Sequence, residues 1–428
     1  MKYHPALKSI IIAALLFAAI VPTKAQYTDD TVFTFLRETY NRHDKNLLGF
    51  LIEEFSLYTE SFPDSNYAAD ATFLLAKCYE QKGKIHNAIA TYFKALFLYP
   101  NSVIHDECAE TIRNIIMKQR IDKTKIEKMH LTLNTEFGGE TAADRYYAYL
   151  KFLFELDYSH YYNLMLSEAR RFTARFPDSP RLDVVLRWIG DIYATKNKPK
   201  EAAISYLRLD FTHPTSILLP VTRFSRGMIL YKKLNRHEDA ANIFSRIVST
   251  YPESDFAGSA QFMLGEIKEK MKKDYIGAIA EYRKFVESYP RHEKVLIALF
   301  VMAELNIKKT KDYVAAINTY DEIVEKFQAN YRGFDALKKA GSLYKDKIKN
   351  YSKAAEYYAK IAEIYPEHKK APEMLIEAGS VCEKKLKNYQ KAIDYYQLVL
   401  DKYPKHKKAK DANKKILKAK AKLTAGEK

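Results

Sequence analysis

The sequence predicts an all-α fold, an α-solenoid of about ten helix-turn-helix repeats with a period of about 38 residues. Gly accounts for 13 of 428 residues and Pro for 14, whereas 29% of the residues are charged, and such a composition favours helix throughout. The prolines from Pro177 to Pro290 are 37, 38 and 38 residues apart, a fixed period that is typical of helical repeats. Most of these prolines follow an aromatic residue, at Phe62-Pro63, Tyr99-Pro100, Phe176-Pro177, Tyr251-Pro252, Tyr289-Pro290, Tyr365-Pro366 and Tyr403-Pro404.

The first 25 residues have the features of a secretory signal peptide. They contain three lysines and no acid, and an apolar run, Ile10–Val21, precedes the small residue Ala25. Twelve apolar residues are fewer than the roughly 20 that a membrane-spanning helix needs, although an uncleaved anchor is the alternative. We therefore expect an exported protein that starts at Gln26, in the periplasm or cell envelope of a Gram-negative bacterium, with no transmembrane span after cleavage.

Each period holds two amphipathic stretches, which are clearest near 67–81 and 85–98. Proline ends the second stretch because it has no N–H to donate and its ring clashes with the preceding turn. Two residues after the proline comes a side chain that can accept a hydrogen bond from the N–H groups that open the next helix. These residues are Ser65, Ser102, Ser179, Ser216, Ser254 and Asn330.

The pattern inside the repeats resembles that of the tetratricopeptide repeat family. Small residues stand where two helices would cross, and aromatic residues would fill the space beside them. Two copies read Ala76, Tyr79, Ala88, Tyr92, Pro100 and Gly190, Tyr193, Ala202, Tyr206, Pro214. Later copies have one more residue between the helices, for example Gly341, Tyr344, Ala354, Tyr358, Pro366. The 38-residue, Tyr-Pro-terminated form is similar to an exported bacterial subset that includes the Tol–Pal-associated periplasmic protein and the lipoprotein of outer-membrane β-barrel assembly.

The resemblance implies a right-handed superhelix over residues 64–404. A degenerate capping repeat, 26–63, would precede it, and a basic capping helix and tail, 405–428, would follow it. Between about 102 and 177 the repeats lose their small residues and contain Gly138-Gly139, which we interpret as a kink or a change of superhelix pitch.

The sequence contains none of the motifs HExxH, GxSxG, a Gly-rich phosphate loop or a calcium loop, so we expect no enzyme, no cofactor and no metal. His292, His368 and His406 occupy equivalent places beside lysine or arginine, and we interpret them as a solvated basic edge. The three cysteines form no CxxC motif, and we expect them to be buried, with a Cys78–Cys108 disulfide as the alternative.

The positive charge is concentrated at the C-terminus. The formal net charge is +17, and eleven lysines lie between Asp401 and Lys428. These lysines are expected to surround a capping helix, and they could also attract an anionic envelope surface or polymer. The export signal argues against nucleic acid as the partner.

In this family the first helix of each repeat lines the concave groove of the superhelix. The resemblance places ten residues there: Phe73, Lys77, Arg187, Asp191, Phe224, Phe262, Glu266, Phe300, Glu304 and Lys338. Four phenylalanines facing solvent would favour a partner segment laid into the groove, whereas packing between neighbouring first helices is the alternative. We expect a non-catalytic scaffold that binds envelope proteins. The alternatives are an adaptor held to an anionic surface by its lysine tail, or the accessory solenoid of a peptidoglycan-acting enzyme.

Overall fold

A computed structural model describes residues 28–119, 121–328 and 330–426, and the expected signal peptide lies outside these ranges. The regular structure of the described residues is entirely helical, which confirms the predicted fold class. The chain divides into two compact units, Met1–His213 and Pro214–Lys428. None of the described helices is both long enough and apolar enough to cross a membrane.

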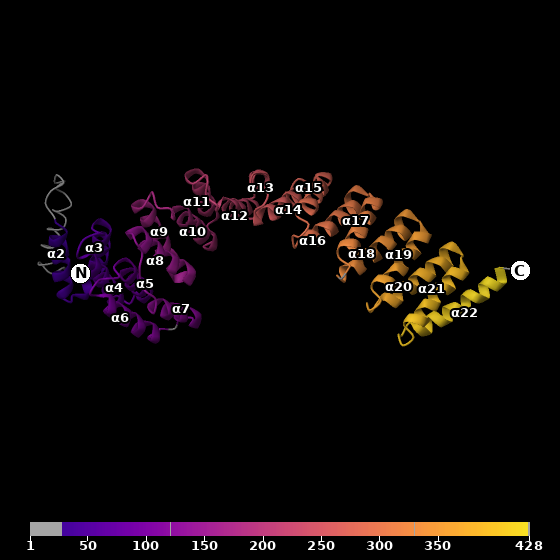
Figure 1. Cartoon of the computed structure of the whole chain (residues 1–428), viewed down its shortest axis with the longest axis horizontal. Helices are drawn as coiled ribbons and strands as arrows, with labels where there is room; N and C mark the ends of the chain where they lie inside the picture. The colour runs from indigo at the N-terminus through magenta and orange to yellow at the C-terminus, as the bar shows by residue number, and fades with distance from the viewer. Residues whose placement is uncertain (1–27, 120, 329, 427–428) are drawn as a thin grey trace, which may run out of the picture. The chain divides into compact units, whose positions relative to one another are not determined.

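Unit 1 contains five helix pairs (Figure 1). In chain order the helices are α2 (Asp29–Asn41), α3 (Leu48–Ser61), α4 (Ala68–Gln81), α5 (Ile85–Leu98), α6 (His105–Lys118), α7 (Lys123–Leu133), α8 (Ala142–Leu156), α9 (Tyr162–Arg175), α10 (Leu182–Thr195) and α11 (Pro199–Thr212). Short 3-10 turns, η1 (Lys45–Leu47) and η2 (Ser159–Tyr161), precede α3 and α9. The limits of α4 and α5 agree with the two stretches predicted from periodicity.

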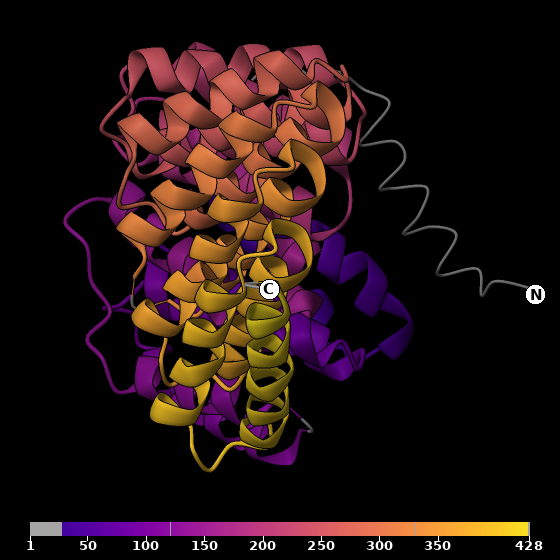
Figure 2. The same ribbon diagram turned by 90° about the vertical axis from the view of Figure 1, so that its right-hand side faces the viewer.

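Unit 2 contains five further pairs and a last helix, stacked in chain order (Figure 1). The helices are α12 (Leu219–Lys232), α13 (His237–Thr250), α14 (Asp255–Lys270), α15 (Tyr275–Ser288), α16 (Val295–Leu305), α17 (Tyr313–Lys326), α18 (Arg332–Leu343), α19 (Tyr351–Ile364), α20 (Ala371–Val381), α21 (Tyr389–Lys402) and α22 (Ala409–Gly426). Figure 2 shows α22 beside the helices that precede it, and its buried residues Ala412, Ile416 and Ala419 belong to the core of this unit.

Small residues let the two helices of a pair approach closely, as the repeat pattern predicted. In five pairs the first helix presents a glycine to an aromatic ring of the second helix. These contacts are Gly190–Tyr206, Gly227–Phe244, Gly265–Tyr282, Gly341–Tyr358 and Gly379–Tyr396. A methyl group added to any of these glycines would lie at most 2.9 Å from the ring, closer than carbon atoms pack. The alanines equivalent to Ala202 in the second helices are fully buried, including Ala278 and Ala392.

The extra residue in the later copies is accommodated by a π-helical turn at the end of the first helix. These turns are η3 (Asn306–Thr310), η4 (Tyr344–Ile348) and η5 (Cys382–Leu386). A π-helical turn holds one more residue than an α-helical turn. The first helix can therefore contain the extra residue and still pack against the second helix of its pair. One left-handed residue then reverses the chain, and an Asp or Asn caps the second helix. For example, Asn350 Oδ1 accepts from the Lys353 N–H at 3.1 Å.

Removing that cap should destabilise unit 2. In Asn350→Ala, one N–H at the start of α19 loses its acceptor, and we expect a loss of about 1 kcal/mol in the free energy of unfolding. Urea unfolding followed by circular dichroism measures this loss. Asn350→Asp keeps the acceptor and should remain within a few tenths of a kcal/mol of the native chain. Equal losses in the two variants would contradict the assigned cap.

The side chains that follow the prolines differ from the prediction in their partners. Ser65, Ser179 and Ser216 accept from the N–H two residues later, in the turn that leads to the next helix, and not from the helix itself. The side chain of Ser254 has no described partner. In other repeats a histidine takes this place: His292 Nδ1 accepts from the Lys294 N–H at 3.1 Å, and His368 does the same for Lys370. These histidines are therefore structural acceptors. Their rings are half-buried, His292 against Phe285 and His368 stacked on Phe334, so the expectation of a solvated edge is wrong for the rings.

The degenerate stretch departs from regular stacking in a way that the sequence did not show. Helix α5 packs on α8 as well as on α6, and only sparse contacts join α6 to α7. Phe93 and Phe97 of α5 lie against Phe152 of α8, with ring centroids 4.4 and 5.6 Å apart. The α6–α7 pair, which lies between α5 and α8 in the sequence, therefore does not separate these two helices in space. This arrangement brings Lys94 of α5 within 2.7 Å of Glu168 of α9.

Candidate functional site

The ten residues proposed for the groove all lie on first helices. Four belong to unit 1, on α4 and α10, and six belong to unit 2, on α12, α14, α16 and α18. Within unit 1, Lys77 pairs with Glu107 of α6, and Arg187 pairs with Asp191 on the same helix. These four residues therefore form two ion-paired groups, one on α4 and α6 and one on α10.

The phenylalanines pack between helices and do not form an open apolar surface. Phe73 and Phe262 are each only 9% exposed, so the expectation that they face solvent is wrong. In unit 2 these rings are covered by the residue 32 positions later, which lies at the start of the first helix of the next repeat. Lys294 covers Phe262 at 5.3 Å, and Arg332 covers Phe300 at 5.5 Å.

Phe224 follows the same rule, but Phe73 does not. Phe224 is half-buried and packs against Phe256, which is also 32 positions later, with centroids 5.5 Å apart. Phe73 is covered from its own helix by Lys77 at 5.1 Å. These rings therefore contribute mainly to the seam between neighbouring repeats, and the packing alternative holds for most of their surface.

The acidic groove residues are already hydrogen-bonded. Asp191 accepts from the Tyr206 hydroxyl at 2.5 Å, and burial raises the pKa of this carboxyl. Glu266 accepts from Lys270 at 2.6 Å and from Tyr231 of α12 at 3.3 Å. Burial alone would raise the pKa of Glu304, but hydrogen bonds from Lys308 and Lys339 outweigh it and hold the pKa below its usual range.

A pocket of about 540 Å³ lies on the first-helix side of unit 2, between α14, α16 and α18. Phe300 and Glu304 from the predicted set contribute to its wall. Three further residues contribute to the wall, Tyr331, Arg332 and Lys309, and the sequence did not single them out. The Tyr331 side chain is 67% exposed. Lys338, the predicted groove residue on α18, is exposed. It directly precedes Lys339, which lines this pocket.

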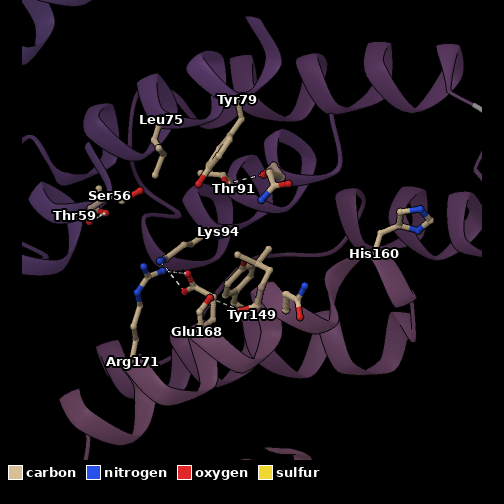
Figure 3. Close-up of a pocket in the computed structure, with 14 residues that line it drawn as sticks. Ser56, Thr59, Leu75, Tyr79, Thr91, Lys94, Tyr149, His160, Glu168 and Arg171 are labelled. Carbon is tan, nitrogen blue, oxygen red and sulfur yellow. Dashed lines mark hydrogen bonds and ion pairs between the residues drawn. The ribbon is translucent and has the colours of Figure 1, made fainter. Parts of the chain in front are cut away.

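A second pocket, of about 350 Å³, lies in unit 1 between α3, α4, α5, α8 and α9 (Figure 3). At its base the Glu168 carboxylate meets the Lys94 ammonium at 2.7 Å and also pairs with Arg171. The Tyr146 hydroxyl donates to the same carboxylate at 2.5 Å. Burial alone would raise the pKa of Glu168, but the two cations outweigh it and hold the pKa below its usual range.

Hydroxyl groups line much of this second pocket. Ser56, Thr59, Thr91 and Ser167 each donate to a carbonyl of their own helix, so their lone pairs remain as acceptors. The fully buried Tyr149 hydroxyl has no described partner. The repeat pattern did not predict this pocket. One signal existed, since Glu168 interrupts the apolar face that Met165, Ala169 and Phe172 define on α9.

The described side chains show little that could carry metal or thiol chemistry. Among the residues described, no cluster of three or more His, Cys, Asp or Glu could hold a metal ion. All three cysteines are buried free thiols, so the Cys78–Cys108 disulfide is not formed. Burial raises the pKa of both Cys78 and Cys108 to about 12, which keeps them protonated and poorly reactive.

Family models match five segments of the chain. Tetratricopeptide repeat models match residues 69–102, 223–254, 259–292 and 335–368, which cover most of the pairs α4–α5, α12–α13, α14–α15 and α18–α19, and residues 380–406, which cover the end of α20, η5 and α21. No curated protein matches the chain.

Several solved structures are similar to the chain at low identity and with low TM-scores. The chain is similar to the Pseudomonas aeruginosa protein PilF at 19% identity, over 55% of this chain and 100% of that one, with a TM-score of 0.34. A tetratricopeptide repeat protein from Parabacteroides merdae is 14% identical, over 64% and 99%, with a TM-score of 0.35. PilW, described as a type IV pilus biogenesis factor, is 13% identical, over 68% and 99%, with a TM-score of 0.30. The tetratricopeptide repeat models thus match five segments of this chain, each of which lies on helices of the repeating helix-turn-helix arrangement.

Proposed function

We propose that the chain is a non-catalytic scaffold that binds a segment of a partner protein on the first-helix face of unit 2. Tetratricopeptide repeats commonly serve as protein-interaction scaffolds, which supports this function. The single observation that carries the location is the pocket between α14, α16 and α18, where an exposed tyrosine and several cations surround a partly open phenylalanine.

The wall of this pocket defines the chemistry of its occupant. Glu304 forms ion pairs with Lys308, at 2.7 Å, and with Lys339, so its charge is already compensated within the protein. Arg332 and Lys309 remain as cations beside the Tyr331 and Phe300 rings, with Asp335 as the nearby acid. A segment that presents an apolar or aromatic side chain next to a carboxylate matches this arrangement. Tyr and Arg are also the residue types that dominate binding energy at interfaces.

The proposed location is the bacterial cell envelope, outside the cytoplasm. The basic start, the twelve-residue apolar run and the small residue at position 25 support export. An envelope protein is therefore the proposed partner.

Tyr331→Ser combined with Arg332→Ser tests the binding site. Both side chains lie at the surface, so the thermal melting curve should change little, whereas capture of envelope proteins by the immobilised chain should fall at least about tenfold. Quantitative mass spectrometry of the captured proteins measures the change.

Two further variants complete this test. Lys360→Ser, on the exposed side of the second helix α19, is the matched control and should capture normally. Changing the exposed tail lysines Lys405, Lys407, Lys410 and Lys414 to glutamine should also leave capture intact, and it keeps the buried face of α22 in the core. If capture survives the Tyr331 and Arg332 changes but is lost with these lysines, the tail is the binding element and the groove proposal is wrong.

A further inference from the structure

One edge of unit 2 carries a lysine in a left-handed backbone conformation in four consecutive repeats. These lysines lie in the turn between the first and second helices, immediately before the residue that caps the second helix. They are Lys273, Lys311, Lys349 and Lys387, with φ of 52°, 61°, 64° and 56°. All four are exposed.

Lysine is not the residue that this backbone conformation favours. A left-handed φ crowds the Cβ atom, so glycine and asparagine are the usual residues at such positions. The same chain uses them at the equivalent position of other repeats, where Gly83, Asn197 and Asn235 precede the second helix. Backbone geometry therefore does not explain four successive lysines, and the feature that lysine adds is its charge.

The four turns lie side by side, so their charges add to one surface. Lys309 of one turn lies over the ring of Tyr275 from the preceding turn at 4.8 Å, and Lys385 lies over Tyr351 at 5.7 Å. Between the last two turns is a depression of about 220 Å³, and lysines 345, 349, 384 and 385 lie in its wall. Each of the segments 268–274, 306–312, 344–350 and 382–388 carries three or four lysines against one or two acids.

Large apolar side chains are exposed at the same turns. Each turn has at least one within three positions of its left-handed lysine: Met271, Ile276, Val314, Ile348 and Leu386. Ile276 is 76% exposed and Val314 is 60% exposed. Single exposed apolar residues are common on proteins, but here they recur in every turn of one charged edge.

We propose that this lysine edge, residues 268–276, 306–314, 344–352 and 382–390, docks on the surface of a bilayer that contains anionic phospholipids. Ammonium groups at the edge would meet lipid phosphates, and the apolar side chains at the tips would enter the headgroup boundary. A soluble polyanion would use the lysines but would leave the apolar tips without a role. This surface meets the pocket proposed to bind protein at Glu269, Lys308 and Lys309, but none of the four left-handed lysines lines that pocket. The proposal does not depend on the lysine tail.

Vesicle flotation with residues 26–428, which include every described helix, tests the proposal. Vesicles of phosphatidylcholine with about one-third phosphatidylglycerol should carry the protein, and pure phosphatidylcholine vesicles should not; binding should weaken as salt rises. Changing the four left-handed lysines to asparagine should lower the affinity at least about tenfold. Because asparagine suits the left-handed conformation, the melting temperature of this variant should not fall.

A matched variant removes the same four charges from the second helices of the same repeats. Lys284, Lys326, Lys360 and Lys402, all exposed, change to glutamine, and binding should remain within about twofold of the native chain because these lysines lie outside the edge. Equal losses in the two variants would mean that overall charge controls binding, which would overturn the proposal.

A third variant, Ile276→Ser with Val314→Ser and Leu386→Ser, distinguishes a bilayer from a soluble polyanion. It should bind vesicles several-fold more weakly and bind dextran sulfate as the native chain does. Unchanged vesicle binding in this variant, or vesicle binding that disappears only when residues 405–428 are removed, would contradict docking through the lysine edge.

Discussion

Glu168→Gln is expected to lower the free energy of unfolding of unit 1 by about 3–5 kcal/mol. The change removes the negative charge that compensates Lys94, whose side chain is only 12% exposed, and that also pairs with Arg171. The one carbonyl oxygen that glutamine retains must serve the three donors Lys94, Arg171 and Tyr146, and its amide group adds a donor among them. Trp188 is the only tryptophan of the chain and stacks on Tyr147 and Phe154 of α8, so its fluorescence reports on this part of unit 1 during urea unfolding.

Glu60→Gln is the matched control for this prediction. Glu60 also pairs with Arg171, but its side chain is 41% exposed, so water screens the interaction and we expect a loss below about 1 kcal/mol. If the two variants are destabilised equally, burial of Glu168 does not control the stability of the cluster.

The pH dependence of the native chain has a defined sign. The pKa of Glu168 is lower in the folded state than in the unfolded state, where it is about 4.3. Its contribution to stability is therefore present above the unfolded pKa and is lost as the pH falls through the folded pKa. Glu168→Gln should flatten the dependence of stability on pH in this acid range.

Gly190→Ala is expected to cost about 1–3 kcal/mol of stability, although alanine is the better helix former. The added methyl group would lie 2.5 Å from Cε1 of Tyr206, inside a crossing where both helices are already in contact. The pair α10–α11 must therefore separate or the tyrosine must move. Urea unfolding followed by circular dichroism measures the change.

Gly49→Ala gives the opposite expectation in the same unit. Gly49 lies in helix α3, and a methyl group there would meet only the mobile end of Lys82, at 3.0 Å. This variant should gain up to about 1 kcal/mol from helix propensity. Losses of similar size at both glycines would show that helix crossing is not the cause.

The helix pairs could be predicted because their signals are local. A proline follows eight of the ten described second helices, all except α7 and α17, and the Gly190–Tyr206 type of contact needs only two residues at a fixed spacing within one repeat. The π-helical turns follow from the same logic, since one extra residue between the helices must be placed somewhere.

The surfaces could be predicted less well because they depend on neighbouring repeats. The cover of Phe262 by Lys294 arises from how one repeat stacks on the next, and the repeat pattern alone placed this ring in solvent. The contact of α5 with α8 joins segments more than 40 residues apart, with α6 and α7 between them in the sequence. The pocket at Glu168 is a consequence of that contact, so no single repeat contains the information for it.

The most direct test of the scaffold proposal is site-specific crosslinking in the cells that make the protein. A photoreactive amino acid replaces Lys338 on the first-helix face of α18 or, as the control, the exposed Lys360 on the second helix α19. The account predicts a specific adduct with another protein from position 338, which disappears when Tyr331 and Arg332 are changed to serine, and no such adduct from position 360. The same adducts from both positions, or an adduct from position 338 that persists in the serine variant, would contradict binding at the first-helix face.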